Sequence, residues 1–121
     1  MLAALPDPRV RAFVVWEPVI RTDLAPPMSS ALGRIGDRRV AQFWDPERLI
    51  SAVLTKTARA HPERLRAGEE IPSVAWDVVL VYAANTRWGD EAPFPAYYGG
   101  PVVDVVDEVK RAIAVELRES R

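Results

Sequence analysis

The chain has 121 residues, of which 49% are hydrophobic and 27% are charged, a composition typical of a folded globular domain. Its 16 lysines and arginines nearly balance its 17 aspartates and glutamates, so the charge gives no reason to expect nucleic acid or an anionic membrane as a partner. There is no cysteine, which excludes thiol and disulfide chemistry by this chain's own residues. A chain of this length can bury one core, so we expect residues 1–121 to form a single domain.

The N-terminal residues do not have the pattern of a signal peptide. Met1 to Leu5 are apolar, but no basic residue precedes them and prolines interrupt the run at once. No apolar stretch approaches the roughly 20 residues that span a bilayer. We therefore expect a cytoplasmic chain without a membrane segment, an expectation that would lapse if a further segment preceded Met1.

The first half of the chain predicts two strands and two helices. Val10–Trp16 is rich in β-branched and aromatic residues, which predicts a short strand buried on both faces, as in a parallel sheet. A serine at position 29 or 30 predicts the cap of a short helix that runs to Ile35. Val40–Trp44 predicts a second strand. Asp45-Pro46-Glu47 then predicts the start of a longer helix to about Ala60, because aspartate caps a helix and proline suits its first position.

The second half predicts a hairpin followed by a helix. Asp77–Ala83 is the most apolar and β-branched run, so we expect its residues 78–82 to form the most buried strand. Phe94–Tyr98 predicts an antiparallel return strand, and its prolines place it at a sheet edge. Gly99-Gly100-Pro101 predicts the start of the last helix. The apolar stripe of that helix, which we expect to pack on the sheet, includes Val106, Val109 and Ile113.

This order of elements resembles the later part of a thioredoxin-like domain, in particular the branch of peroxiredoxins and thiol-disulfide oxidoreductases. The resemblance is carried by Phe13–Trp16, Val40–Pro46, Asp77–Tyr82 and the pair Gly99-Gly100. It implies an α/β, three-layer fold with a central mixed sheet and helices on both faces.

The chain departs from the thioredoxin-like pattern at two places. The family's first strand and Cys-x-x-Cys motif would lie before residue 1, with residues 1–9 as the tail of the first helix. Ala75 or Trp76 stands where the family has a cis-proline. The resemblance places the missing strand between Val10–Trp16 and Asp77–Ala83. We therefore expect an N-terminally truncated domain; the alternative is that the flanking strands pair directly or with another chain.

The functional expectation is a redox-inactive thioredoxin-like domain, the remainder of a thiol-disulfide oxidoreductase-like protein whose dithiol segment lies upstream. The alternative is a non-enzymatic protein- or ligand-binding module on the same scaffold. A protein partner or a homodimer would bind through the exposed sheet. We expect no catalytic residues, no cofactor and no metal, because the lone His61 lies beside Pro62 without a second histidine or a cysteine.

Four residues form the candidate partner or ligand face, namely Trp16, Glu17, Asp23 and Trp76. Trp16 and Trp76 lie at the ends of predicted central strands, where α/β sheets place ligands. The alternative is that the four tryptophans of the chain contribute only packing area to the core.

Overall fold

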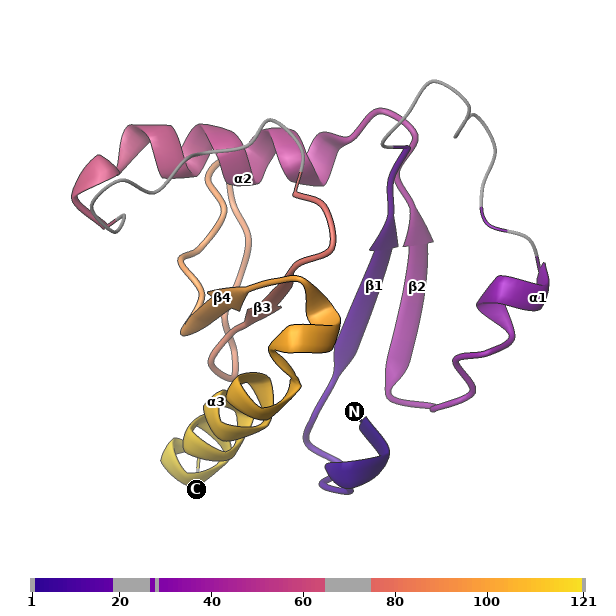
Figure 1. The fold of residues 1–121 in the computed structure, drawn as a ribbon. Helices are drawn as coiled ribbons and strands as arrows, with labels where there is room; N and C mark the ends of the chain where they lie inside the picture. Colours follow the sequence, from indigo (N-terminus) through magenta and orange to yellow (C-terminus); the bar gives the residue numbers. More distant parts are fainter. Residues whose placement is uncertain (1, 19–26, 28, 65–74, 121) are drawn as a thin grey trace. The chain divides into compact units, whose positions relative to one another are not determined.

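The computed structural model describes residues 2–18, 27, 29–64 and 75–120. The chain has the α/β composition that the sequence predicts (Figure 1). It divides into two compact units, which we call the first unit, Leu2–Ile50, and the second unit, Ser51–Arg121. Each unit is described by itself.

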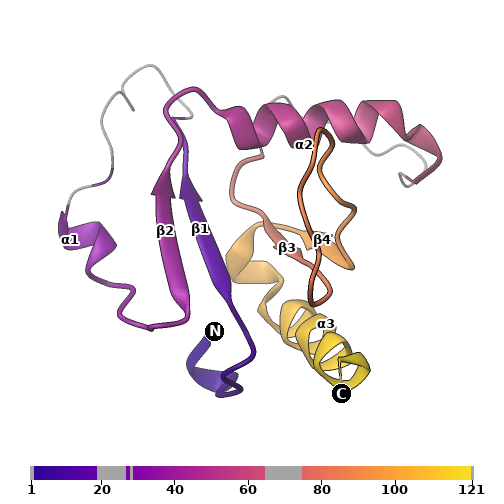
Figure 2. The ribbon, with the colours of Figure 1, turned by 180° about the vertical axis from the view of Figure 1, so that it is seen from behind.

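The first unit contains a two-stranded parallel sheet. Strands β1 (Ala12–Trp16) and β2 (Val40–Trp44) pair in register from Ala12 opposite Val40 to Trp16 opposite Trp44. Figures 1 and 2 show them side by side and pointing the same way. Both strands confirm the sequence prediction. Helix α1 (Ser29–Leu32) follows β1 in the chain and ends before the predicted Ile35.

The prediction that the first strand is buried on both faces is wrong. Side chains alternate across a strand, and Phe13 and Val15 on one face of β1 are 69% and 37% exposed. Phe43 on the same face of β2 is 51% exposed. The alternate residues, among them Val14 and Trp16, are half-buried. An apolar run therefore did not mean burial on both sides here.

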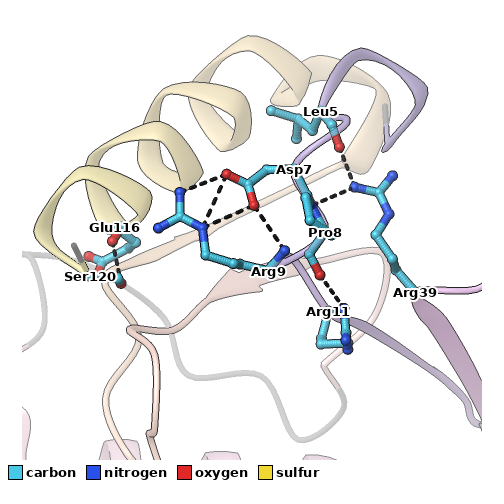
Figure 3. A network of polar contacts seen from close by, with 8 residues as sticks. All are labelled: Leu5, Asp7, Pro8, Arg9, Arg11, Arg39, Glu116 and Ser120. Carbon is cyan, nitrogen blue, oxygen red and sulfur yellow. Dashed lines mark hydrogen bonds and ion pairs between the residues drawn. The ribbon is translucent and has the colours of Figure 1, made fainter.

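Arg39 fastens the N-terminal segment to the start of β2 (Figure 3). Its guanidinium donates to the carbonyls of Leu5, Asp7 and Leu2, the last two at 3.1 and 2.9 Å. Asp37 pairs with the same group at 2.6 Å, and hydrogen bonds from Arg39 lower the pKa of Asp37 to about 2. Only 15% of the Arg39 side chain is exposed. Its guanidinium therefore binds groups of this chain and is largely shielded from solvent.

Helix α2 (Leu49–Ala60) begins later than the sequence predicts. Asp45 is the cap, since its carboxylate accepts a hydrogen bond from the Ile50 amide at 2.8 Å. Pro46, however, is not the first helical residue. Arg48 has a left-handed φ of 56°, a conformation that an α-helix cannot contain, so the helix starts only after it.

The second unit contains an antiparallel pair, β3 (Val79–Val81) and β4 (Tyr97–Gly99), with Val79 opposite Gly99 and Val81 opposite Tyr97. The predicted strand Asp77–Ala83 is thus shorter at both ends. Asp77 has a φ of 51°, which is incompatible with an extended strand. A side chain at Gly100 would collide with the Asp77 carbonyl, so this close approach requires glycine.

Helix α3 (Val106–Glu119) packs against β3 and forms the core of the second unit. Val109 is 1% exposed and Val81 is 7% exposed, whereas Val106 and Ile113 are half-buried. The apolar stripe is confirmed, but Pro101 does not open this helix. A 3-10 turn, η3 (Val102–Asp104), comes first, and its Val102 amide donates to the Asp77 carboxylate at 3.2 Å.

Two buried hydroxyl groups of α2 hold the segments on either side of β3. Ser51, fully buried, accepts a hydrogen bond from the Ala75 amide at 2.9 Å. Thr57, 3% exposed, accepts one from the Ala92 amide, also at 2.9 Å. The entry to β3 and the connection from β3 to β4 are therefore both hydrogen-bonded to side chains of α2.

Candidate functional site

The carboxyl ends of β1 and β2 bring two tryptophan-acid pairs together in the first unit. Parallel strands end at the same edge, and the register sets Trp16 opposite Trp44. The Trp16 indole donates to the Gln42 side-chain carbonyl at 3.0 Å, and the Asp45 amide donates to the Trp16 carbonyl at 2.8 Å. Glu17 and Asp45, the next residue after each strand, consequently lie at one edge of the sheet.

The carboxyl groups of Glu17 and Asp45 form a hydrogen-bonded pair. Burial raises the pKa of Asp45, but hydrogen bonds from the Ile50, Leu49 and Arg48 amides and from Glu17 outweigh burial, so the net pKa is lowered. A hydrogen bond between two carboxyl groups requires one proton. The backbone amides stabilise the charged form of Asp45. The pair ties the end of β1 to the cap of α2.

Two of the four residues in the predicted partner or ligand face lie together at one end of a described sheet. Trp16 and Glu17 lie at the sheet edge just described. Trp76 belongs to the second unit, where it precedes β3 and is 69% exposed. Asp23 lies outside the described residues. A single face made by all four residues stays a prediction.

The partner of Glu17 was missed by sequence reasoning, which treated Asp45 only as a helix cap. A signal for it exists in the chain: β1 ends in Trp16-Glu17-Pro18 and β2 ends in Trp44-Asp45-Pro46. The repeated order of tryptophan, acid and proline at the ends of two strands indicates that the two acids meet, provided that the strands are parallel and in register.

A second feature of the first unit is an exposed apolar surface, which we call the Phe13–Phe43 face and define as Phe13, Val15 and Phe43. The two phenyl rings stack with centroids 6.2 Å apart and planes 29° apart. Val15 lies opposite Phe43 in the register and shares their side of the sheet. Neither β1 nor β2 contains a charged residue, so nothing on these strands makes the face polar.

The tryptophan at position 88 fits the packing interpretation better than a ligand-binding one. Its ring meets Tyr82 edge to face with centroids 6.1 Å apart. The Tyr82 hydroxyl is buried and has no hydrogen-bond partner among the described residues, and burial raises the pKa of Tyr82 to about 12. Tyr82 and Trp88 therefore act as an aromatic pair with a neutral phenol.

Among the described residues, no group of three or more histidines, aspartates and glutamates could hold a metal ion. In that same part of the chain, every helix is too short or too polar to cross a membrane. Comparisons with protein-family models, with curated proteins and with solved structures give no match.

Proposed function

We propose that this chain is a thioredoxin-like domain that does no redox chemistry with its own residues and acts as a protein-binding module. The observation that carries this proposal is the Phe13–Phe43 face, an uncharged and exposed side of a paired sheet. The occupant we propose is a second copy of the chain, so that the module forms a homodimer through the exposed sheet.

The order and pairing of the elements support the thioredoxin-like fold. The chain runs through β1, α1, β2, α2, β3, β4 and α3, which is the order that the resemblance implies. The described strands form two separate pairs, one parallel and one antiparallel. A mixed sheet with one further strand between β1 and β3 would join these two pairs into one domain.

The size of the face predicts a weak dimer. A phenylalanine side chain can bury about 150–250 Å², so the three partly exposed residues offer on the order of 300 Å² of apolar surface, the scale of an interaction patch. Two such faces in an isologous contact would bury on the order of 600 Å². Stable interfaces bury roughly 1,200–2,000 Å². We therefore expect association that depends strongly on concentration.

Light scattering over a wide concentration series tests the homodimer. The molar mass of the wild-type chain is expected to rise with concentration, and Phe13→Lys is expected to stay monomeric because a lysine in the contact must be desolvated. Val103→Lys is the matched control, since Val103 is 82% exposed and lies in the second unit. A wild-type chain that stays monomeric throughout, or a Phe13→Lys variant that associates like the wild type, would contradict the proposal.

The separate strand pairs also favour a second proposal, in which the chain is the part of a thiol-disulfide oxidoreductase-like protein that follows its dithiol segment. In that case an upstream segment would supply both the further strand and the dithiol. The genomic DNA in frame before the Met1 codon distinguishes the two. An apolar strand followed by Cys-x-x-Cys there supports the oxidoreductase, and a stop codon with a ribosome-binding site close to Met1 supports the binding module.

Both functions share one expected result for the chain as it stands. The purified chain should neither reduce insulin disulfides nor consume peroxide above background, because both reactions need a thiolate and the 121 residues include no cysteine. Turbidity of insulin and peroxide consumption measure this directly. Turnover that persists after contaminating thioredoxin has been removed would show that the chain is not redox-inactive.

A further inference from the structure

His61, the only histidine of the chain, lies between two carboxylates of the second unit. Its Nδ1 is 3.2 Å from Glu63 Oε1, and its Nε2 is 3.1 Å from Glu91 Oε2. Glu63 belongs to the 3-10 turn η2 (Pro62–Arg64), which follows α2 directly. Glu91 belongs to the connection between β3 and β4. One imidazole ring therefore bridges the end of α2 and a segment 30 residues further along the chain.

The protonation state of the ring decides whether both contacts are attractive. Carboxylate oxygens only accept hydrogen bonds, and a neutral imidazole has a single N–H to donate. The imidazolium form donates from both nitrogens. In the neutral form, one nitrogen lone pair would face a carboxylate without a proton between them. The observed arrangement is thus complete only when His61 carries a positive charge.

The surroundings hold the ring in this position. The Phe94 ring meets the imidazole edge to face with centroids 5.5 Å apart. The Arg64 guanidinium lies over the same phenyl ring at 4.2 Å. Among the described residues, the charged groups around His61 are therefore Glu63 and Arg64 from η2 and Glu91 from the connection. Hydrogen bonds that the ring donates to Glu91 and Glu63 raise the pKa of His61.

The contact also lies next to a buried attachment of the same connection. Ala92, the residue after Glu91, donates its amide to Thr57 of α2. The side chains of His61, Glu63 and Glu91 are 35%, 65% and 55% exposed. Water and salt screen such exposed pairs. The contacts of His61 therefore add only a small stabilisation to that of the buried Thr57–Ala92 hydrogen bond.

We propose that His61 is a pH-sensitive latch that holds the β3–β4 connection on the end of α2 when the imidazole is protonated and loosens it when the proton is lost. A histidine whose pKa is raised in the folded state contributes stability that is fully present below its unfolded pKa, about 6.5. That contribution disappears as the pH rises through the higher folded value. The latch is accordingly closed in mild acid and open in alkaline solution.

An NMR titration of the single histidine tests the charge part of this proposal. The midpoint of the His61 ring signals should fall in Glu91→Gln and in Glu63→Gln, because each variant removes one negative charge and keeps the side-chain shape. Glu119→Gln, an exposed acid near the end of α3, is the control and should leave the midpoint unchanged. Midpoints that do not move in either latch variant would overturn the proposal.

Hydrogen exchange tests the structural part. After correction for intrinsic rates, the amides of residues 89–92 should lose protection in the wild-type chain as the pH rises through the His61 midpoint. In His61→Gln the same amides should show no such pH dependence, while the circular dichroism spectrum confirms that the variant is folded. An identical pH dependence in both proteins would show that His61 does not latch the connection.

Discussion

Replacing Val109 by aspartate is expected to unfold the second unit. Val109 lies in α3, which packs against β3, and is 1% exposed, the lowest value among the described core hydrophobic residues. An aspartate there would place a carboxylate in the core of the second unit. Burying such a charge costs several kcal/mol, against a total stability of about 5–15 kcal/mol for a typical domain. Little or no folded second unit should remain.

Thermal unfolding followed by circular dichroism measures this effect, and α3 supplies its own control. Val115→Asp makes the same chemical change in the same helix, at a residue that is 40% exposed, where the carboxylate stays in contact with water. Val115→Asp should melt close to the wild type. If Val109→Asp also melted within a few degrees of the wild type, the core assigned to α3 and β3 would be wrong.

The sequence predicted the elements whose signal is local. Short apolar runs located β1 and β2, an acid before a helix identified the Asp45 cap, and apolar spacing identified the stripe of α3. It failed where single residues adopt left-handed backbone conformations. Arg48 delays α2 and Asp77 shortens β3, and neither residue type signals a positive φ as a glycine would.

The expected burial of Val79 illustrates a different limit. A run of five apolar residues, 78–82, predicts a buried strand but not how deeply each residue is buried. In the structure Val81 is buried and Val79 is only half-buried, although side chains two residues apart lie on the same side of a strand. The same limit explains the Phe13–Phe43 face, since an apolar strand pattern does not tell how many of its faces are covered.

The contacts at the candidate sites depend on residues far apart in the chain. Glu17 was singled out, yet its partner Asp45 follows a different strand, and the contact depends on the β1–β2 register. His61 was dismissed as isolated because its neighbours in sequence offered no metal or catalytic set. Glu91, which completes its bridge, is supplied by the return path from β3 to β4. Pairings of this kind follow from topology, which local patterns do not contain.

Replacing Thr57 by valine is expected to destabilise the second unit by about 1–3 kcal/mol, the usual cost of leaving a buried polar group without its partner. Thr57 and Ala92 are 3% and 4% exposed, so water cannot reach the Ala92 amide once the hydroxyl is gone. Valine has nearly the shape of threonine, and a methyl group replaces the hydroxyl without creating a cavity. The loss therefore reports on the hydrogen bond and not on packing.

Urea denaturation measures the loss of stability, and exchange of the Ala92 amide locates it. In Thr57→Val this amide should exchange much faster than in the wild type, because its acceptor at 2.9 Å has been removed. Thr57→Ser, which keeps the hydroxyl and loses only a methyl group, should retain slow exchange. An Ala92 amide that stays equally protected in Thr57→Val would mean that the connection is held by other contacts.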